Sequence, residues 1–188
     1  KVHGHGFGTP SPNFTVPRSV TGARPPPGPG AFFFRRTCYW NGMTYSDTFL
    51  HDVLKTTKCI ACVGVSPNPV RPSYFVFRYM QLRRFRMIPV NPVAAGTEIL
   101  GEPVYGDLSE IPSDTKVDMV DIFRNSDAAG GVIDEAIAIG AKAVWTQLDV
   151  INRPAAERAV QAGLDVVMDR CPKIEIPRLG LLKAPDGR

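Results

Sequence analysis

The sequence predicts an α/β fold built on a parallel sheet of five strands, and two patterns support this prediction. The first is a series of short apolar runs, typical of strands covered on both faces, at 59–65, 87–90, 117–123, 143–148 and 164–168. The second is a set of segments with helical apolar spacing, at 46–55, 72–82, 126–140 and 152–163. Strands that alternate with helices form right-handed βαβ units, so we expect a single doubly wound domain.

Start signals in the sequence support each helix in turn. Ser46 is the expected N-cap of the first helix. Pro72 suits the first turn of the second helix, where its missing N–H costs nothing. Ser126 and Asn152 are the expected N-caps of the third and fourth helices, and the chain after Pro172 is expected to pack back over the sheet. This succession predicts a Rossmann-like domain.

Residues 1–42 differ in composition from the rest of the chain. They are rich in Gly, Pro, Ser, Thr and Arg, and the proline run at 24–30 fits neither a helix nor a central strand. We therefore expect a disordered or loosely packed N-terminal arm, either an expression leader or an upstream extension, followed by the domain at 43–188. Phe32–Phe34 is the one apolar patch of the arm.

The positive charge of the chain is concentrated in the same arm. The formal net charge is +4, but residues 1–42 hold five basic residues and no acid. The remainder holds 17 basic and 18 acidic residues, which gives a formal charge of −1. A nearly neutral domain gives no reason to expect a nucleic acid partner. No apolar run approaches the roughly 20 residues of a membrane span, so we expect no membrane partner either.

The four cysteines do not form a recognisable metal or disulfide motif. Cys59 and Cys62 have the C-x-x-C spacing, but they fall within a predicted strand. Residues three apart in a strand point to opposite faces, so these two thiols cannot easily share a metal or a disulfide. We interpret them as small buried apolar residues. Reduced thiols are typical of the cytoplasm.

The turn after the first strand, residues 64–73, has the features of an anion site. Gly64 ends the strand, where the backbone must turn sharply or let a ligand approach. Pro72 then opens a helix whose free N–H groups are aimed above the strand, and such helix starts bind phosphates. Arg71 adds a fork of donors at the same place. We interpret this turn as the phosphate turn of a nucleotide-type ligand.

Ligands of doubly wound sheets bind outside the carboxyl ends of the strands, so the residues that follow each strand are the candidate site. They are mostly polar, and two helix starts point at them. The set comprises Gly64, Val65, Ser66, Asn68, Arg71, Pro72, Ser73, Asn91, Pro92, Phe123, Arg124, Asn125, Gln147 and Leu148. Phe123 and Pro92 could flank a flat base. Alternatively, Asn and Ser at such positions act only as caps and turn formers.

Two kinds of function are disfavoured by what the candidate site lacks. The glycine fingerprint of dinucleotide sites is absent after Gly64, and the second strand ends in Asn91-Pro92 rather than an acid, so NAD is not expected. His51 lies on the first helix and the other two histidines lie in the arm. A Ser-His or Cys-His pair is therefore not expected among the residues that follow the strands, which form the rim of the sheet. Cys171 is a candidate reactive thiolate only because Arg170 and Lys173 lie near it in the sequence and could lower its pKa.

Six blocks of the chain, taken in order, strongly resemble the small stand-alone CoA-binding domain proteins of bacteria and archaea. The resemblance covers roughly residues 44–179. The blocks are residues 63–73 (VGVSPNPVRPS), 88–92 (IPVNP), 98–105 (EILGEPVY), 120–124 (VDIFR), 135–142 (EAIAIGAK) and 167–173 (VMDRCPK). More distantly, the chain is similar to the CoA-binding domain of the succinyl-CoA synthetase alpha subunit.

The resemblance implies that coenzyme A is the ligand and distributes its parts over the rim. It implies that the 64–73 turn faces the diphosphate, that Asn91 and Pro92 line the adenosine end, and that Phe123, Arg124 and Gln147 form the far wall. The turn departs from the glycine-rich synthetase turn, and Ala94 stands near the place of a synthetase lysine. The charge for a 3′-phosphate must therefore come from an arginine or be missing. The synthetase phosphohistidine belongs to a second domain without a counterpart here, so the resemblance implies binding rather than ligation.

The leading hypothesis is a domain that binds CoA or an acyl-CoA and performs no chemistry of its own. One alternative is an enzyme that acts on a CoA thioester or nucleotide, with Cys171 or Asp169 taking part. Another is an interaction module with a vestigial pocket. Each of these three hypotheses is compatible with a homodimer or with a partner protein.

Overall fold

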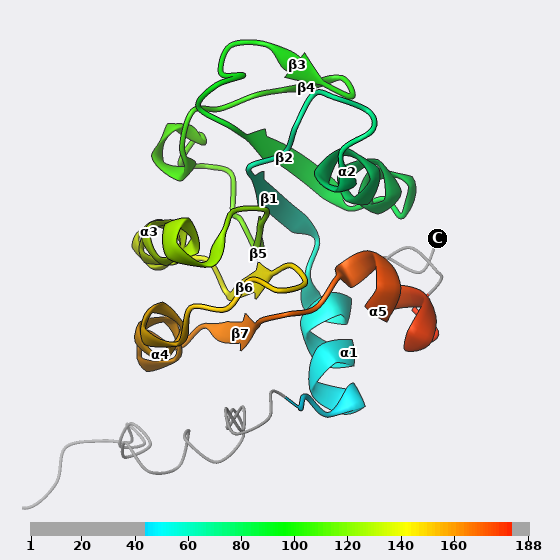
Figure 1. Ribbon diagram of the computed structural model, residues 1–188, viewed down its shortest axis with the longest axis vertical. Helices are drawn as coiled ribbons and strands as arrows, with labels where there is room; N and C mark the ends of the chain where they lie inside the picture. The colour runs from blue at the N-terminus through cyan, green and yellow to red at the C-terminus, as the bar shows by residue number, and fades with distance from the viewer. Residues whose placement is uncertain (1–43, 182–188) are drawn as a thin grey trace, which may run out of the picture. The chain divides into compact units, whose positions relative to one another are not determined.

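The five predicted strands form one parallel sheet in the order β2-β1-β5-β6-β7 (Figure 1). The computed structural model describes residues 44–181, so the expected arm at 1–42 and the expected domain start at Met43 lie outside the described residues. The strands are β1 (Cys59–Val63), β2 (Arg86–Val90), β5 (Met119–Ile122), β6 (Ala143–Thr146) and β7 (Asp165–Val167). The predicted α/β fold with a five-stranded parallel sheet is confirmed.

Helices cover both faces of this sheet (Figure 1). One face carries α1 (Asp47–Thr56), α2 (Pro72–Leu82) and α5 (Pro172–Arg178). The other carries α3 (Ser126–Ala138) and α4 (Arg153–Gln161). Because α5 buries Ile176 in the same apolar cluster as α1 and α2, the chain after Pro172 does pack back over the sheet.

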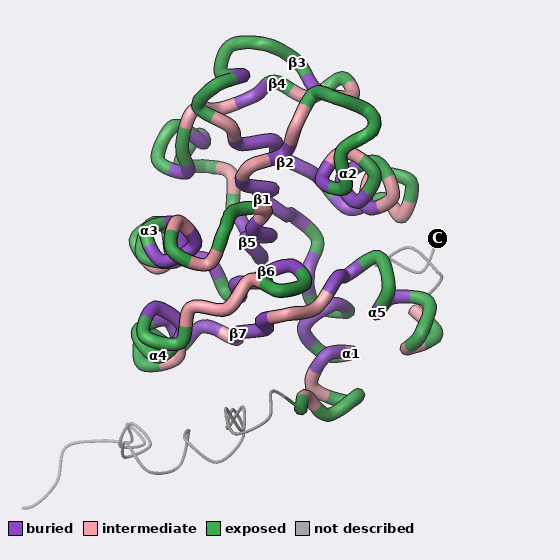
Figure 2. The backbone as a smooth tube through the Cα atoms, in the orientation of Figure 1, coloured by how far each residue is buried: buried purple, intermediate pink, exposed green. Residues whose placement is uncertain are grey.

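The core consists of two apolar clusters, one on each side of the five-stranded sheet, and each strand of that sheet is buried over most of its length (Figure 2). Alternate residues of β1 enter different clusters, so that Cys59 packs on the α3–α4 side and Cys62 on the α1–α2 side. The expectation that these two thiols point to opposite faces is therefore confirmed. Both cysteines are buried and free, as is Cys171.

Side-chain caps begin three of the helices, and one of them differs from the prediction. Ser46 Oγ accepts a hydrogen bond from Phe49 N at 3.2 Å, and Asn152 Oδ1 accepts one from Ala155 N at 3.1 Å, as expected. Ser126 was the wrong cap for α3, because Asn125 Oδ1 accepts from Ala128 N at 2.8 Å. The Ser126 hydroxyl instead accepts from Ile151 N at 3.0 Å, which ties the start of α3 to the start of α4.

The connection from β2 to β5 positions the site. It contains a small hairpin of β3 (Glu98–Ile99) and β4 (Glu102–Pro103), a parallel bridge between Val90 and Tyr105, and a 3₁₀ turn, η2 (Leu108–Glu110). After β1 the chain turns into α2 on one face of the sheet, whereas after β5 it turns into α3 on the other face (Figure 1). The carboxyl ends of β1 and β5 therefore form a topological switch point, where doubly wound folds bind ligands.

No helix within residues 44–181 has the length and apolar content that crossing a membrane requires.

Candidate functional site

Gly64 lies at the switch point itself. Its N–H donates to the carbonyl of Val90 at 2.8 Å, and the next strand end is held by Phe123 N donating to the carbonyl of Val63 at 2.8 Å. The φ angle of Gly64 is +86°, and a Cβ added there would come within 2.5 Å of the carbonyl oxygen of Phe123. Both the backbone conformation and this contact favour glycine at this position.

The predicted phosphate turn is held together by its own polar side chains. Ser66 N donates to the Oγ of Ser73 at 3.1 Å, Asn68 N donates to the Oγ of Ser66 at 3.2 Å, and Val70 N donates to the Oδ1 of Asn68 at 3.0 Å. These three side chains are thus turn formers, while both serine hydroxyls keep a proton to donate. Pro72 is the first residue of α2, as expected.

Arg71 precedes α2 in the N-cap position. Its side chain is exposed and makes no capping hydrogen bond to the helix. The guanidinium therefore stands beside the start of an 11-residue helix, where the partial positive charge of the backbone also favours an anion.

Asn91 connects the phosphate turn to the loop after β2. Its Nδ2 donates to the carbonyl of Val65 at 2.8 Å, and its Oδ1 accepts from Val93 N at 3.0 Å. The side chain of Val65 is fully buried in the core, so only its backbone faces this loop. The two segments at the carboxyl ends of β1 and β2 are thereby fixed relative to each other.

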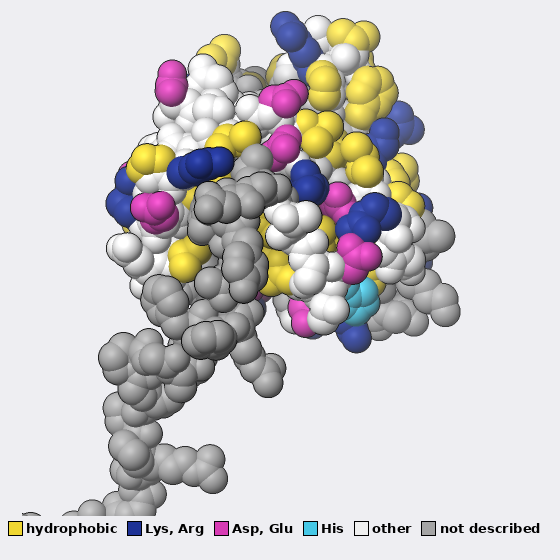
Figure 3. Space-filling view, turned by 60° about the horizontal axis from the view of Figure 1, so that its bottom comes forward, with side chains coloured by type: hydrophobic (Ala, Val, Ile, Leu, Met, Phe, Trp, Pro, Cys, Tyr) yellow, Lys and Arg dark blue, Asp and Glu magenta, His cyan; other side chains and the backbone are white. Residues whose placement is uncertain are grey.

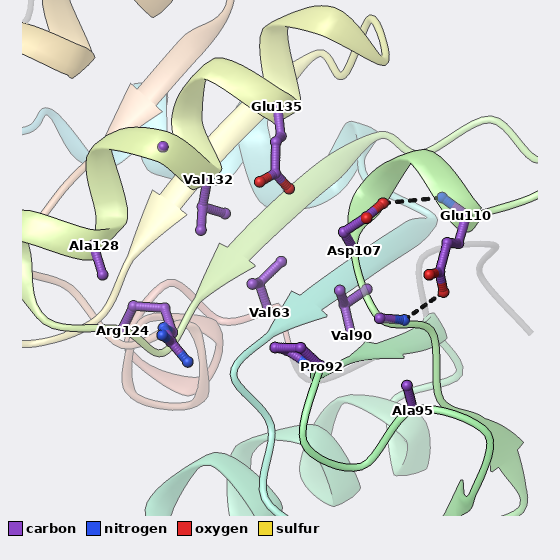
Figure 4. Close-up of a pocket in the computed structure, with 12 residues that line it drawn as sticks. Val63, Val90, Pro92, Ala95, Asp107, Glu110, Arg124, Ala128, Val132 and Glu135 are labelled. Carbon is purple, nitrogen blue, oxygen red and sulfur yellow. Dashed lines mark hydrogen bonds between the residues drawn. The ribbon is translucent and has the colours of Figure 1, made fainter.

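A cavity of about 510 Å³ opens beside the switch point on the α3 side of the sheet (Figure 4). This volume falls in the range of roughly 300–1,000 Å³ found for small-molecule sites. Two of the predicted residues, Pro92 and Arg124, line it. Apolar side chains form much of the remaining wall, namely Val63, Val90, Ala95, Ala128 and Val132.

Three acidic residues of the cavity were missed by the sequence analysis: Asp107, Glu110 and Glu135. Glu135 lies on α3 one turn beyond Val132, in the helical series 128, 131, 132 and 135, so its position on the cavity side could have been found from that spacing. Asp107 and Glu110 could not, because they lie at the single 3₁₀ turn η2, which is too short to leave a periodic pattern in the sequence.

Hydrogen bonds fix Asp107 and Glu110 in this loop. Oδ1 of Asp107 accepts from the hydroxyl of Ser109 at 2.6 Å and from the backbone N–H groups of Ser109 and Glu110. The Ser109 bonds, led by the hydroxyl, hold the pKa of Asp107 below its ordinary value. Glu110 Oε2 accepts from Gly106 N at 2.6 Å. The cavity therefore has a fixed negative end.

The remaining predicted residues after β5 and β6 lie apart from the cavity lining. Asn125 caps α3, and the half-buried Phe123 packs against the core on the α1–α2 side. Leu148 is 51% exposed and borders a second cavity of about 390 Å³, together with Arg170 and Cys171. The structure therefore places Leu148 and Arg124 at different cavities.

Gln147 is turned inward to a buried carboxyl group that the sequence analysis also missed. Its Nε2 donates to Oδ1 of Asp121 at 2.6 Å, while Oδ2 of Asp121 has no partner among the described residues. Burial raises the pKa of Asp121 to about 7, although the Gln147 amide and the N–H of Ile122 oppose that rise. The sequence does contain a signal for this buried group, because Asp121 is an acid between the apolar residues of a predicted strand.

The groups that could supply chemistry are unfavourably placed. Burial raises the pKa of the Cys171 thiol, which lowers the fraction of reactive thiolate at neutral pH. Asp169 Oδ1 accepts a hydrogen bond from Asp149 N at 2.8 Å, a structural role. His51 lies on α1, outside the cavity lining. Within residues 44–181, no three His, Cys, Asp or Glu side chains are grouped so as to hold a metal ion.

Comparisons with known proteins agree with the fold. Residues 58–177 match the family described as CoA binding domain. The uncharacterized protein YneT of Bacillus subtilis is 35% identical over 125 residues, which cover 66% of this chain and 90% of that protein. These matches confirm the family resemblance.

Solved structures show the same similarity. A hypothetical protein from Pyrococcus horikoshii is 36% identical with a TM-score of 0.68, covering 72% of this chain and 92% of that one. A protein from Thermus thermophilus is 32% identical with a TM-score of 0.68, covering 72% and 99%.

A larger protein contains a similar domain. The dinucleotide-forming acetyl-coenzyme A synthetase 1 of Ca. Korarchaeum cryptofilum is 25% identical with a TM-score of 0.52, over 62% of this chain and 27% of that one. The match thus covers a minor part of the synthetase chain. Because the family match covers most of the described residues, the chain belongs to the CoA binding domain family.

Proposed function

We propose that the protein binds coenzyme A or an acyl-CoA at the switch point and performs no chemistry of its own. Membership of the CoA binding domain family supports the ligand class. The observation that carries the proposal is the contact between Gly64 and Phe123, which brings the phosphate turn to the edge of the cavity lined by Arg124.

In this proposal the parts of the ligand are distributed over the carboxyl edge of the sheet. The diphosphate lies at the turn and the start of α2, held by Gly64, Val65, Ser66, Asn68, Arg71, Pro72 and Ser73. The adenosine lies against Asn91 and Pro92, at the cavity that Pro92 lines. Arg124 forms the far wall and offers its guanidinium to the diphosphate, whereas Phe123, Asn125, Gln147 and Leu148 lie outside the lining of the cavity.

Binding without chemistry accounts for the state of the reactive groups. Burial raises the pKa of Cys171, Asp169 holds a structural hydrogen bond, and neither residue lines the cavity, so neither supports nucleophilic chemistry there. An enzyme of CoA thioesters would be revealed by turnover that disappears in Cys171→Ala or Asp169→Ala. We propose a cytoplasmic location, where the three buried thiols within residues 44–181 would stay reduced.

Thermal unfolding in the presence of candidate ligands tests the proposal. A ligand at about 100 times its Kd adds roughly 2.7 kcal/mol to the free energy of unfolding. We expect CoA to raise the melting temperature and NAD, which lacks its fingerprint here, to leave it unchanged. A rise with NAD and none with saturating CoA would refute the proposal. Native mass spectrometry of freshly purified protein would show independently which ligand co-purifies.

A further inference from the structure

The cavity beside the switch point has opposite charges at its two ends (Figure 4). Arg124 follows β5 next to the start of α3, so this end combines a guanidinium with the positive end of a 13-residue helix. Asp107 and Glu110 lie at the other end, and Glu135 points from α3 toward the space between them and the sheet. The cavity is therefore positively charged at one end and negatively charged at the other, and a bound ligand would be oriented by this difference.

The balance of charge in the cavity is negative. Three carboxylates face one guanidinium in its lining, which amounts to a formal charge of −2 at neutral pH. Asp107 and Glu110 are fixed by the hydrogen bonds of their loop. The carboxylate of the exposed Glu135 has no hydrogen bond or ion pair within residues 44–181, so it is available to a ligand.

The wall between these ends suits a flat ring. Val63 and Val90 end two adjacent strands, and Val132 faces them from α3 (Figure 4). Gly131 has no side chain, and a Cβ at that position would meet no atom within 4 Å. The space is therefore open above an apolar surface, which is the usual environment of a bound base.

We infer that this cavity takes the adenosine end of a CoA-type ligand and selects against a phosphate on the ribose 3′ oxygen. The amino group of adenine and free ribose hydroxyls are donors, which the carboxylates of Asp107, Glu110 and Glu135 can accept. A 3′-phosphate adds a charge of about −1.5 to −2 and meets charges of the same sign. Dephospho-CoA, which keeps the diphosphate for Arg124 and lacks the 3′-phosphate, should bind at least as tightly as CoA.

The inference rests on the proposed function, and Glu135→Gln tests it separately. This substitution removes one negative charge and keeps the size of the side chain, and it breaks no hydrogen bond within residues 44–181. Glu157→Gln on α4 is the matched control, because Glu157 is also exposed and lies outside the cavity lining.

Calorimetric titrations of the wild type and both variants with CoA and with dephospho-CoA decide the matter. We expect Glu135→Gln to tighten CoA binding by about three- to tenfold and dephospho-CoA binding by less than about twofold, with no change in Glu157→Gln. CoA binding tighter than dephospho-CoA in the wild type, or an unchanged ratio in Glu135→Gln, would overturn this inference alone. Binding of neither ligand to the wild type would overturn the proposed function with it.

Discussion

Gly64 and Phe123 meet across the switch point, where a Cβ on Gly64 would come within 2.5 Å of the carbonyl oxygen of Phe123. The contact joins the turn after β1 to the end of β5, and these two segments leave the sheet toward opposite faces. The side chain of Arg124 also passes close by, since its Cδ would lie 3.0 Å from that Cβ. The turn at 64–73, which we propose holds the phosphates, therefore lies next to the cavity.

Gly64→Ala should destabilise the fold by about 1–3 kcal/mol, because alanine must adopt a positive φ and also push against Phe123. Gly101→Ala separates the two causes, since Gly101 has φ of +81° but open space around the added Cβ. Urea unfolding of both variants measures the difference. Equal losses of stability would show that the contact with Phe123 is not tight.

Arg124→Ala should weaken CoA binding roughly ten- to a hundredfold, since a charge-assisted bond to phosphate contributes about 1.5–3 kcal/mol. Arg71→Ala should have an effect of the same order at the start of α2. Both side chains are exposed, so the melting temperature of the unliganded variants should change little. Affinity should also fall as salt rises.

Arg78→Ala is the control for these charge deletions, because Arg78 is exposed on α2 and lies outside the cavity lining. Calorimetric titration with CoA compares the three variants. If Arg71→Ala and Arg124→Ala both bind CoA like Arg78→Ala, the two arginines do not belong to the site, and backbone N–H groups must hold the phosphates.

The buried carboxyl group of Asp121 should make stability depend on pH. Its pKa is raised from 3.8 to about 7 in the folded protein, mainly by burial. Between these values the folded state holds a proton that the unfolded state releases, so the free energy of unfolding falls as pH rises, by up to about 1.4 kcal/mol per pH unit. The contribution is fully present below the unfolded pKa and is lost as pH passes about 7.

Asp121→Asn should flatten this part of the profile, because an amide does not titrate and can still accept the hydrogen bond from Gln147. Urea unfolding at several values between pH 5 and pH 8 measures both proteins. Asp118 does not interfere, since its pKa is lowered and its contribution is lost only at more acidic pH. Parallel profiles for the wild type and Asp121→Asn would contradict a raised pKa at this position.

The arrangement of the sheet could be predicted from the sequence because its signals are local and repeated. The apolar runs of β1 and β5 and the caps Ser46 and Asn152 each agree with the structure. The ends of the strands were less certain. The predicted strands at 117–123 and 143–148 include Phe123 and Gln147. In the structure β5 and β6 end just before these residues, which lie in the turns that leave the sheet.

The site was predicted only where it follows the strands directly. Pro92 and Arg124 were found because the carboxyl ends of parallel strands meet at one edge. Asp107 and Glu110 were not, because the loop that brings them there has no periodic pattern. Ser66 and Asn68 were expected to face a ligand, yet their side-chain oxygens accept hydrogen bonds from backbone N–H groups of the turn. The sequence does not distinguish such an internal hydrogen bond from a contact with a ligand.

The position of the ligand can be tested by filling the cavity. Gly131 lies on α3, lines the cavity, and has nothing within 4 Å of an added Cβ. Gly131→Leu should therefore block the cavity while keeping or raising stability, since glycine costs a helix about 1 kcal/mol relative to good helix formers. Ala138→Leu, at an exposed position two turns further along the same helix and outside the cavity lining, is the matched control.

Calorimetric titration of CoA into the wild type, Gly131→Leu and Ala138→Leu tests the central claim most directly. We predict that the wild type and Ala138→Leu bind CoA alike and that Gly131→Leu binds it at least about tenfold more weakly, a loss of about 1.4 kcal/mol. Equal binding by all three proteins would show that the adenosine end lies elsewhere, and no binding by the wild type would contradict CoA as the ligand.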